Sequence, residues 1–223
     1  RALDHQGLAE EAITVYTRIT RIEPGCERVY YYLGNALANL HHYPDAIDAF
    51  SKSLSQNPSR IESWSGMGRA LVILKKYEEA VDAFNNLLEL RPDETDILFE
   101  KGLALSQIKK PDSALEAFNR CIELGLNNSR VHAEKGFVLF ELDRNEEAIA
   151  SLDRALELDS ADTVSHRVKG EILQKINRHE EAIAEFEATL VLDPENTLAH
   201  RGRGIALAKL GRYEDAVVAL DRA

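Results

Sequence analysis

Residues 61–94 read IESWSGMGRALVILKKYEEAVDAFNNLLELRPDE, and the pattern in this stretch decides the fold. Its two halves, Ile61 to Leu74 and Tyr77 to Leu90, carry apolar residues at every third or fourth position, which is the period of an amphipathic helix. Only two lysines separate the halves, and so short a link joins antiparallel helices. Pro92 then ends the second helix, because proline cannot continue one. The stretch therefore predicts one helix hairpin.

The hairpin recurs along the chain without a break in phase. Glycine returns every 34 residues, and an alanine follows each of these glycines by 12 residues. A fixed period of this length indicates stacked copies of one supersecondary unit. Asn128, Asp162 and Asn196 stand where the next helix needs an N-cap. The glycines that mark the phase are Gly34, Gly68, Gly102, Gly136, Gly170 and Gly204.

The small residues indicate close helix contact. Glycine inside a helix costs about 1 kcal/mol relative to alanine. Its return in every copy predicts a contact that offsets this cost. We expect Gly68 and Ala80 to face each other across the two helices of one repeat.

Trp64, Gly68, Ala80, Phe84 and Pro92 stand at the spacings of the tetratricopeptide repeat, which the whole chain resembles. The resemblance implies an all-α, right-handed superhelical solenoid of antiparallel helix pairs, with the first helix of each pair inside. It predicts a single solenoid over residues 1–223, with a partial repeat in residues 1–26. The further repeats start near residues 27, 61, 95, 129, 163 and 197, and the last one is incomplete.

Four basic residues replace the apolar residue that the family carries just before the glycine. We expect their stems to pack and their charges to reach water. They are Lys101, Lys135, Lys169 and Arg203.

Composition and charge favour a soluble chain in a reducing compartment. The 27 basic and 38 acidic side chains give a net charge of −11. The longest purely aliphatic run, Ala70 to Leu74, is far too short to span a membrane. Cys26 and Cys121 are nearly three repeats apart, so we expect two free thiols and a cytoplasmic location. Both ends of the parent protein are expected to be missing, because the chain starts and stops within helical patterns.

No arrangement of residues predicts catalysis. His132, His166 and His200 recur one repeat apart at the position of Trp64, so they form a ladder rather than a cluster. One metal ion could not join them, because metal–histidine bonds measure about 2 Å. The chain also lacks a Gly-Lys-Ser/Thr phosphate loop and a Gly-x-Ser-x-Gly motif. We therefore predict no enzymatic activity, no cofactor and no metal.

The resemblance places the binding surface on the inner helices. Phe99, Leu103, Phe137 and Phe140 would form an apolar strip there, as is typical of peptide-binding grooves. The alternative is that such residues are half-buried between successive inner helices and serve only packing. The end of the array adds basic residues, including Lys175 and Lys209. The predicted groove residues are Tyr31, Asn35, Arg69, Ile73, Phe99, Leu103, Phe137, Phe140, Arg167 and Arg201.

These features favour a protein–protein interaction scaffold that binds a partner polypeptide segment in its concave groove. The alternative is a substrate-docking or regulatory arm of a larger enzyme whose catalytic domain is not in this chain. Nucleic acid is disfavoured as a partner, because the acidic chain offers no continuous basic track. The family's clamp for acidic chaperone tails is also disfavoured, since Asn35 matches its pattern but Tyr31 and Gly66 do not.

The two ends of the array are predicted to expose apolar side chains. Terminal repeats lack a neighbour on one side. We expect these ends to be covered either by further chain or by another copy. Contact with another copy would give end-to-end self-association. The residues concerned are Ala2 and Leu3 at the start, and Val217, Val218 and Leu220 at the end.

Overall fold

The computed structural model describes residues 6–223, which form thirteen α-helices joined by turns and contain no strand. The prediction of an all-α array is confirmed. Ala2 and Leu3 lie outside the described residues. The helices are α1 (Gln6–Ile22), α2 (Glu27–Asn39), α3 (Tyr43–Gln56), α4 (Ile61–Ile73), α5 (Tyr77–Leu90), α6 (Thr95–Gln107), α7 (Pro111–Glu123), α8 (Ser129–Glu141), α9 (Asn145–Leu158), α10 (Thr163–Lys175), α11 (His179–Leu192), α12 (Thr197–Lys209) and α13 (Tyr213–Leu220).

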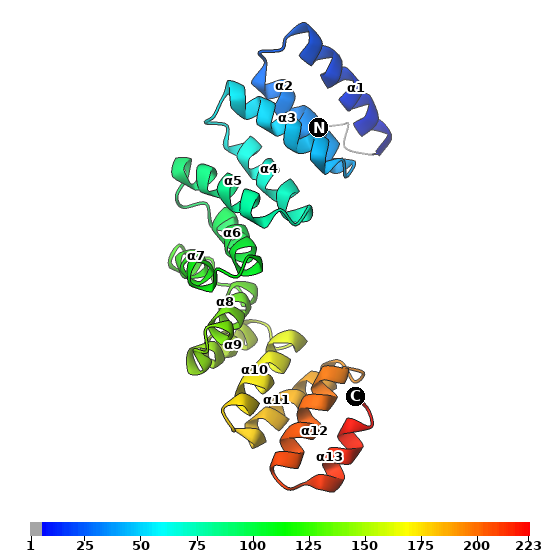
Figure 1. The fold of residues 1–223 in the computed structure, drawn as a ribbon, viewed down its shortest axis with the longest axis vertical. Coiled ribbons are helices and arrows are strands. Elements are labelled where there is room, and N and C mark those ends of the chain that lie inside the picture. The colour runs from blue at the N-terminus through cyan, green and yellow to red at the C-terminus, as the bar shows by residue number, and fades with distance from the viewer. Residues whose placement is uncertain (1–5) are drawn as a thin grey trace. The chain divides into compact units, whose positions relative to one another are not determined.

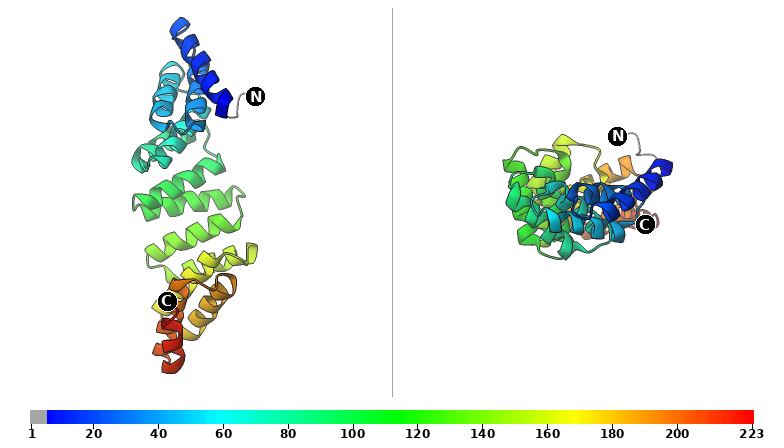
Figure 2. Two further views of the ribbon diagram at one scale, coloured as in Figure 1. Left: turned by 90° about the vertical axis from the view of Figure 1, so that its right-hand side faces the viewer. Right: turned by 90° about the horizontal axis from the view of Figure 1, so that it is seen from above.

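The helices form two compact units, one of residues 1–110 and one of residues 111–223. In unit 1, each helix from α1 to α6 packs on the next, and α2 also contacts α4 (Figure 1). In unit 2, the same holds from α7 to α13, and α10 also contacts α8 and α12 (Figures 1 and 2). We call α2, α4, α6, α8, α10 and α12 the A helices, and α3, α5, α7, α9, α11 and α13 the B helices that follow them.

The turn inside each helix pair has one backbone conformation throughout. Its left-handed residue lies seven positions after the glycine, for example Lys75 with φ 59°. The N–H of Lys75 donates to the carbonyl of Val72, and that of Lys76 to the carbonyl of Leu71, both at 2.9 Å. This satisfies the last carbonyls of the A helix. The left-handed residues are His41, Lys75, Lys109, Asp143, Asn177 and Gly211.

Several of the repeated glycines pack on aromatic rings of the core. A Cβ atom at Gly34 would lie 2.6 Å from the ring of Phe50, and one at Gly66 would lie 2.5 Å from the same ring. Phe50 is fully buried between the two A helices. The nearest side chain to Gly68 is likewise the ring of Phe84 rather than the predicted Ala80. Gly34, Gly68 and Gly170 therefore make room for the ring that follows the alanine by four residues, whereas Gly136 and Gly204 pack on Leu152 and Leu220 at that position.

Aromatic side chains near the start of the A helices fasten the turns between repeats. Nε1 of Trp64 donates to the carbonyl of Pro58 at 2.8 Å. Nε2 of His200 donates to the carbonyl of Pro194 at 2.9 Å, in the equivalent place. Nε2 of His166 lies 3.3 Å from the carbonyl of Ser160. The histidine ladder is thus part of the turn structure.

The predicted helix caps are confirmed. The side chain of Asn128 accepts a hydrogen bond from the N–H of Val131, and Asn196 accepts one from Ala199. Asp162 accepts hydrogen bonds from two backbone N–H groups at the start of α10. These bonds satisfy donors that have no partner within their helix.

Candidate functional site

A cavity of about 360 Å³ lies along the A helices α2, α4 and α6 of unit 1. Three predicted groove residues, Tyr31, Asn35 and Arg69, contribute to its wall. Apolar side chains of the A helices and of α5 form part of the lining, and polar groups form the rest. The lining residues are Tyr31, Asn35, Ile61, Glu62, Ser65, Gly66, Arg69, Leu87, Glu94, Asp96 and Ile97.

Tyr31 is held in place by neighbours on three sides. Its ring centroid lies 5.2 Å from that of Tyr32 and 6.4 Å from that of Phe50. The guanidinium of Arg60 lies 5.2 Å above the ring and also donates to Glu27 at 3.1 Å. That hydrogen bond holds the pKa of Glu27 below its usual value. The aromatic wall of the cavity is therefore preorganised.

Arg69 joins two of the helices that border the cavity. Its Nε donates to the two carboxylate oxygens of Glu100 on α6, at 2.9 and 3.1 Å. Two acidic residues of the rim are also near arginines, since Glu62 lies 3.7 Å from Arg60 and Glu94 lies 3.6 Å from Arg91. Three of the four charged residues of the lining therefore lie near an opposite charge, and Asp96 is the fourth.

Asn35 and Ser65 bring hydrogen-bonding groups that no other residue uses. Within residues 6–223, neither side chain has a hydrogen-bond partner in the protein. An asparagine amide offers both donor and acceptor, and a serine hydroxyl does the same. This wall can therefore receive hydrogen bonds from, and donate them to, a bound molecule.

The other predicted groove residues lie outside this cavity. Ile73 is exposed at the end of α4. Phe99 and Leu103 are half-buried on α6, and Phe137 and Phe140 are half-buried on α8. Phe99 and Leu103 belong to unit 1, whereas the other two belong to unit 2, so the predicted strip is not a feature of either unit alone.

The predicted basic residues of unit 2 differ in what they contact. Arg167 pairs with Glu171 at 2.5 Å. Lys175 pairs with Asp143 at 2.7 Å and lies 5.0 Å above the ring of Phe140. Arg201 is exposed, and within residues 6–223 it has no charged partner.

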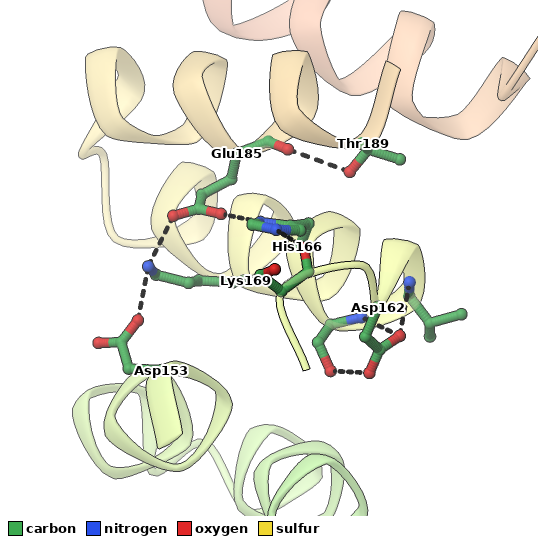
Figure 3. A network of polar contacts seen from close by, with 9 residues as sticks. Asp153, Asp162, His166, Lys169, Glu185 and Thr189 are labelled. Atoms are coloured by element: carbon green, nitrogen blue, oxygen red, sulfur yellow. Dashed lines mark hydrogen bonds and ion pairs between the residues drawn. The ribbon is translucent and has the colours of Figure 1, made fainter. Parts of the chain in front are cut away.

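A polar cluster in unit 2 was not foreseen from the sequence. Nζ of Lys169 lies 2.6 Å from carboxylate oxygens of both Asp153 and Glu185, and Nδ1 of His166 lies 2.6 Å from Glu185 (Figure 3). The side chain of Lys169 is only 16% exposed, and its ammonium is paired with two carboxylates. Burial opposes the charged ammonium, yet the two hydrogen bonds raise the pKa of Lys169 above its usual value.

One signal in the sequence could have revealed this cluster. Glu185 occupies a position where other repeats carry Ala49, Ala83, Ala117 or Ala219. A glutamate at a buried alanine position needs a cation nearby. Lys169 is that cation, and it lies where Met67 packs in an earlier repeat.

The remaining features concern metals, thiols and membranes. Residues 6–223 hold no group of three or more His, Cys, Asp or Glu side chains that could bind a metal ion. Cys26 is a half-buried free thiol, and Cys121 is buried. Among the described helices, none combines the length and the hydropathy that a membrane span requires.

The apolar end of the described chain is exposed. Val217, Val218 and Leu220 on α13 are each more than two-fifths exposed. Self-association through these side chains stays a prediction. Light scattering over a concentration series would detect it as a rise in mass.

Comparisons with known proteins agree with the repeat fold. Models of the tetratricopeptide repeat match residues 27–60, 65–125, 99–163 and 167–223. No curated protein sequence matches the chain. The solved structure of YrrB, a TPR protein with an unusual peptide-binding site, is similar with a TM-score of 0.74 and 21% identity, over 82% of this chain and 95% of that chain.

Two further solved structures share the fold. A MamA protein from Desulfovibrio magneticus has a TM-score of 0.72 and 21% identity, over 76% of this chain and 96% of its own. A chain of the APC/C hetero-tetramer Cut9–Hcn1 has a TM-score of 0.63 and 17% identity, over 99% of this chain and 44% of its own. At these identities the likeness concerns the fold alone.

Proposed function

This chain belongs to the tetratricopeptide repeat family, whose members typically mediate protein–protein interactions and are generally non-catalytic, and we propose that its unit 1 binds a partner polypeptide segment. The site of this proposal is the cavity along α2, α4 and α6. The observation that carries it is the combination of a preorganised wall with unused hydrogen-bonding groups.

The chemistry of the wall suits a peptide. Ile61, which is half-buried, can contact an apolar side chain, while Asn35 and Ser65 can bond the backbone amides beside it. Pockets of roughly 300–1,000 Å³ are the usual size for a bound group, and this cavity lies at the lower end of that range. One or two side chains of a longer segment would fill it. The shared fold of YrrB is consistent with a peptide ligand.

A cavity-filling variant tests the proposal. Ser65→Arg places a long side chain in the cavity while leaving the buried core untouched. Ser51→Arg on the B helix α3 is the matched control, because Ser51 is exposed and lies away from the cavity. Affinity capture with the purified chain, read by quantitative mass spectrometry, should show partners that Ser65→Arg loses and Ser51→Arg retains. Capture of the same partners by both variants would contradict the proposal.

Phe137 on α8 of unit 2 stays a separate prediction from the sequence, apart from the cavity of unit 1. Phe137→Glu would abolish capture without changing the melting temperature if this side chain binds the partner. Because Phe137 is half-buried, a large fall in melting temperature would instead support the packing alternative. Circular dichroism melting separates the two results.

A further inference from the structure

Helix α12 has a charge pattern that sets it apart within the described chain. Its sequence, TLAHRGRGIALAK, holds Arg201, Arg203 and Lys209 but no acidic residue. Every other helix in residues 6–223 has at least one aspartate or glutamate. The whole chain carries a net charge of −11, so this basic helix stands in an acidic protein.

Aliphatic side chains lie exposed beside these charges. Leu198 is 42% exposed and Ile205 is 38% exposed on α12, and Val164 on the neighbouring α10 is 46% exposed. Leu198, Arg201 and Ile205 follow one another at spacings of three and four, which places them on one face of the helix. We name Val164, Leu198, Arg201, Ile205 and Lys209 the α10–α12 surface.

The exposure at Leu198 is a property of its position in the repeat. Val164 occupies the same position one repeat earlier, where α12 follows and packs on α10. Val164 is nevertheless as exposed as Leu198. The aliphatic pair is therefore open to solvent although neighbouring helices are present.

The basic side chains of this surface are available to a partner. In the neighbouring repeat the basic side chains form ion pairs within the protein, Arg167 with Glu171 and Lys175 with Asp143. Arg201 and Lys209 are exposed, and neither has an ion pair with any residue in 6–223. Arg203 is different, because it is less exposed and has Glu187 4.0 Å away.

We propose that the α10–α12 surface binds an acidic peptide segment with aliphatic side chains, at a site distinct from the cavity of unit 1. Carboxylates of the segment pair with Arg201 and Lys209, and its leucine, isoleucine or valine side chains cover Val164, Leu198 and Ile205. This proposal does not depend on the function proposed for unit 1.

The helix geometry sets the expected spacing in the ligand. Arg201 and Lys209 are eight residues apart, which is about 12 Å along a helix at 1.5 Å per residue. An extended peptide advances about 3.3 Å per residue, so carboxylates about four residues apart would match the two cations. The acidic remainder of the protein does not prevent this, because charges beyond about 8 Å are largely screened at physiological ionic strength.

Selection from a library of short random peptides tests the proposal on the intact chain. We expect the selected peptides to be enriched in Asp and Glu together with Leu, Ile and Val. Fluorescence anisotropy with a selected acidic peptide should show that Arg201→Glu combined with Lys209→Glu weakens binding by about tenfold or more. Arg18→Glu combined with Lys52→Glu is the matched control, because both residues are exposed in unit 1, on α1 and α3, and the change in net charge is the same.

Single substitutions and a competitor distinguish the α10–α12 surface from the cavity of unit 1 and from a general polyanion site. Val164→Ser should weaken binding of the same peptide, since the aliphatic contact is lost. Ser65→Arg, in the cavity of unit 1, should leave it unchanged, so the two proposals can fail independently. Selection of neutral or basic peptides, or full binding by the charge-reversed pair, would overturn the inference. So would equal competition by a single-stranded oligonucleotide, which would indicate a site for any polyanion.

Discussion

The helix pairs α4–α5 and α10–α11 occupy equivalent places in the repeat but fill the space between their helices differently. In α4–α5, Trp64 and Met67 pack against a core that includes the buried Ala83. In α10–α11, the equivalent positions hold His166, Lys169 and Glu185, which bond to one another (Figure 3). The same backbone accommodates both arrangements, because apolar side chains pack on apolar ones in the first pair and opposite charges meet in the second.

This comparison shows why the three positions must change together. An apolar group in this place needs only apolar neighbours, whereas a charge needs an opposite charge and hydrogen bonds. Glu185 has Lys169 and His166, and Lys169 also has Asp153 on the previous helix pair. Removing Glu185 leaves Lys169 with Asp153 alone, and removing Lys169 leaves both carboxylates without their cation. The apolar arrangement should therefore be destabilised by adding a charged residue, and the polar arrangement by removing one.

The largest effect is expected from placing the glutamate alone in the apolar pair. Ala83→Glu would bury a carboxylate beside Met67 with no cation equivalent to Lys169. We expect the unfolding free energy to fall by about 3 kcal/mol or more, because the buried carboxylate would lose its hydration without gaining a cation. Urea denaturation would measure it, with the exposed Asn86→Glu on the same helix as control. Equal stability of the two variants would show that the site admits water.

Removing the glutamate from the polar pair should have a smaller effect. Glu185→Ala is expected to cost about 2 kcal/mol, because Lys169 and His166 lose a partner in a partly buried place. Adding Lys169→Met should restore part of that loss by recreating the apolar arrangement. Thermal unfolding of the single and double variants checks this. If the double variant unfolds at a lower temperature than Glu185→Ala alone, the expected compensation is absent.

A still smaller effect compares the turns of the repeats. Lys75 adopts a left-handed conformation with φ 59°, where Gly211 stands in the last repeat. Lys75→Gly is expected to stabilise by about 0.5 kcal/mol, because relief of about 1–2 kcal/mol of strain exceeds the added chain entropy of glycine. Gly211→Lys should destabilise correspondingly. Denaturation midpoints that move the same way in both variants would show that backbone strain does not decide stability at this turn.

The smallest effect concerns acid pH and Glu134, which stands where Gly66 and Gly202 pack on rings. Burial raises the pKa of Glu134 above its usual value, so the folded state disfavours its charged form. Glu134→Gln should therefore be more stable than the original chain at neutral pH. That advantage should shrink as the pH falls through the raised pKa and disappear below the usual pKa. Stability curves against pH for both chains would show a constant difference if Glu134 were not responsible.

The site was predictable only in part. Tyr31, Asn35 and Arg69 were named from their positions in the repeat, and they line the cavity of unit 1. The apolar residues that stood out in the sequence, such as Phe137, are half-buried, and their part in binding stays a prediction. Hydrophobicity in a sequence does not reveal exposure, because exposure depends on which helix lies above the residue.

The sequence by itself determined the helix pairs, their phase and their caps. These features follow from local periods and from backbone preferences of residues such as Pro92 and Asn196, which act within a few positions of the chain. Only the tertiary structure decided which side chains meet between helices. Phe84 against Gly68, and Lys169 between Asp153 and Glu185, join residues 16 positions apart. Such contacts depend on the angle and distance at which the helices cross, and the hydrophobic period of a single helix does not determine these.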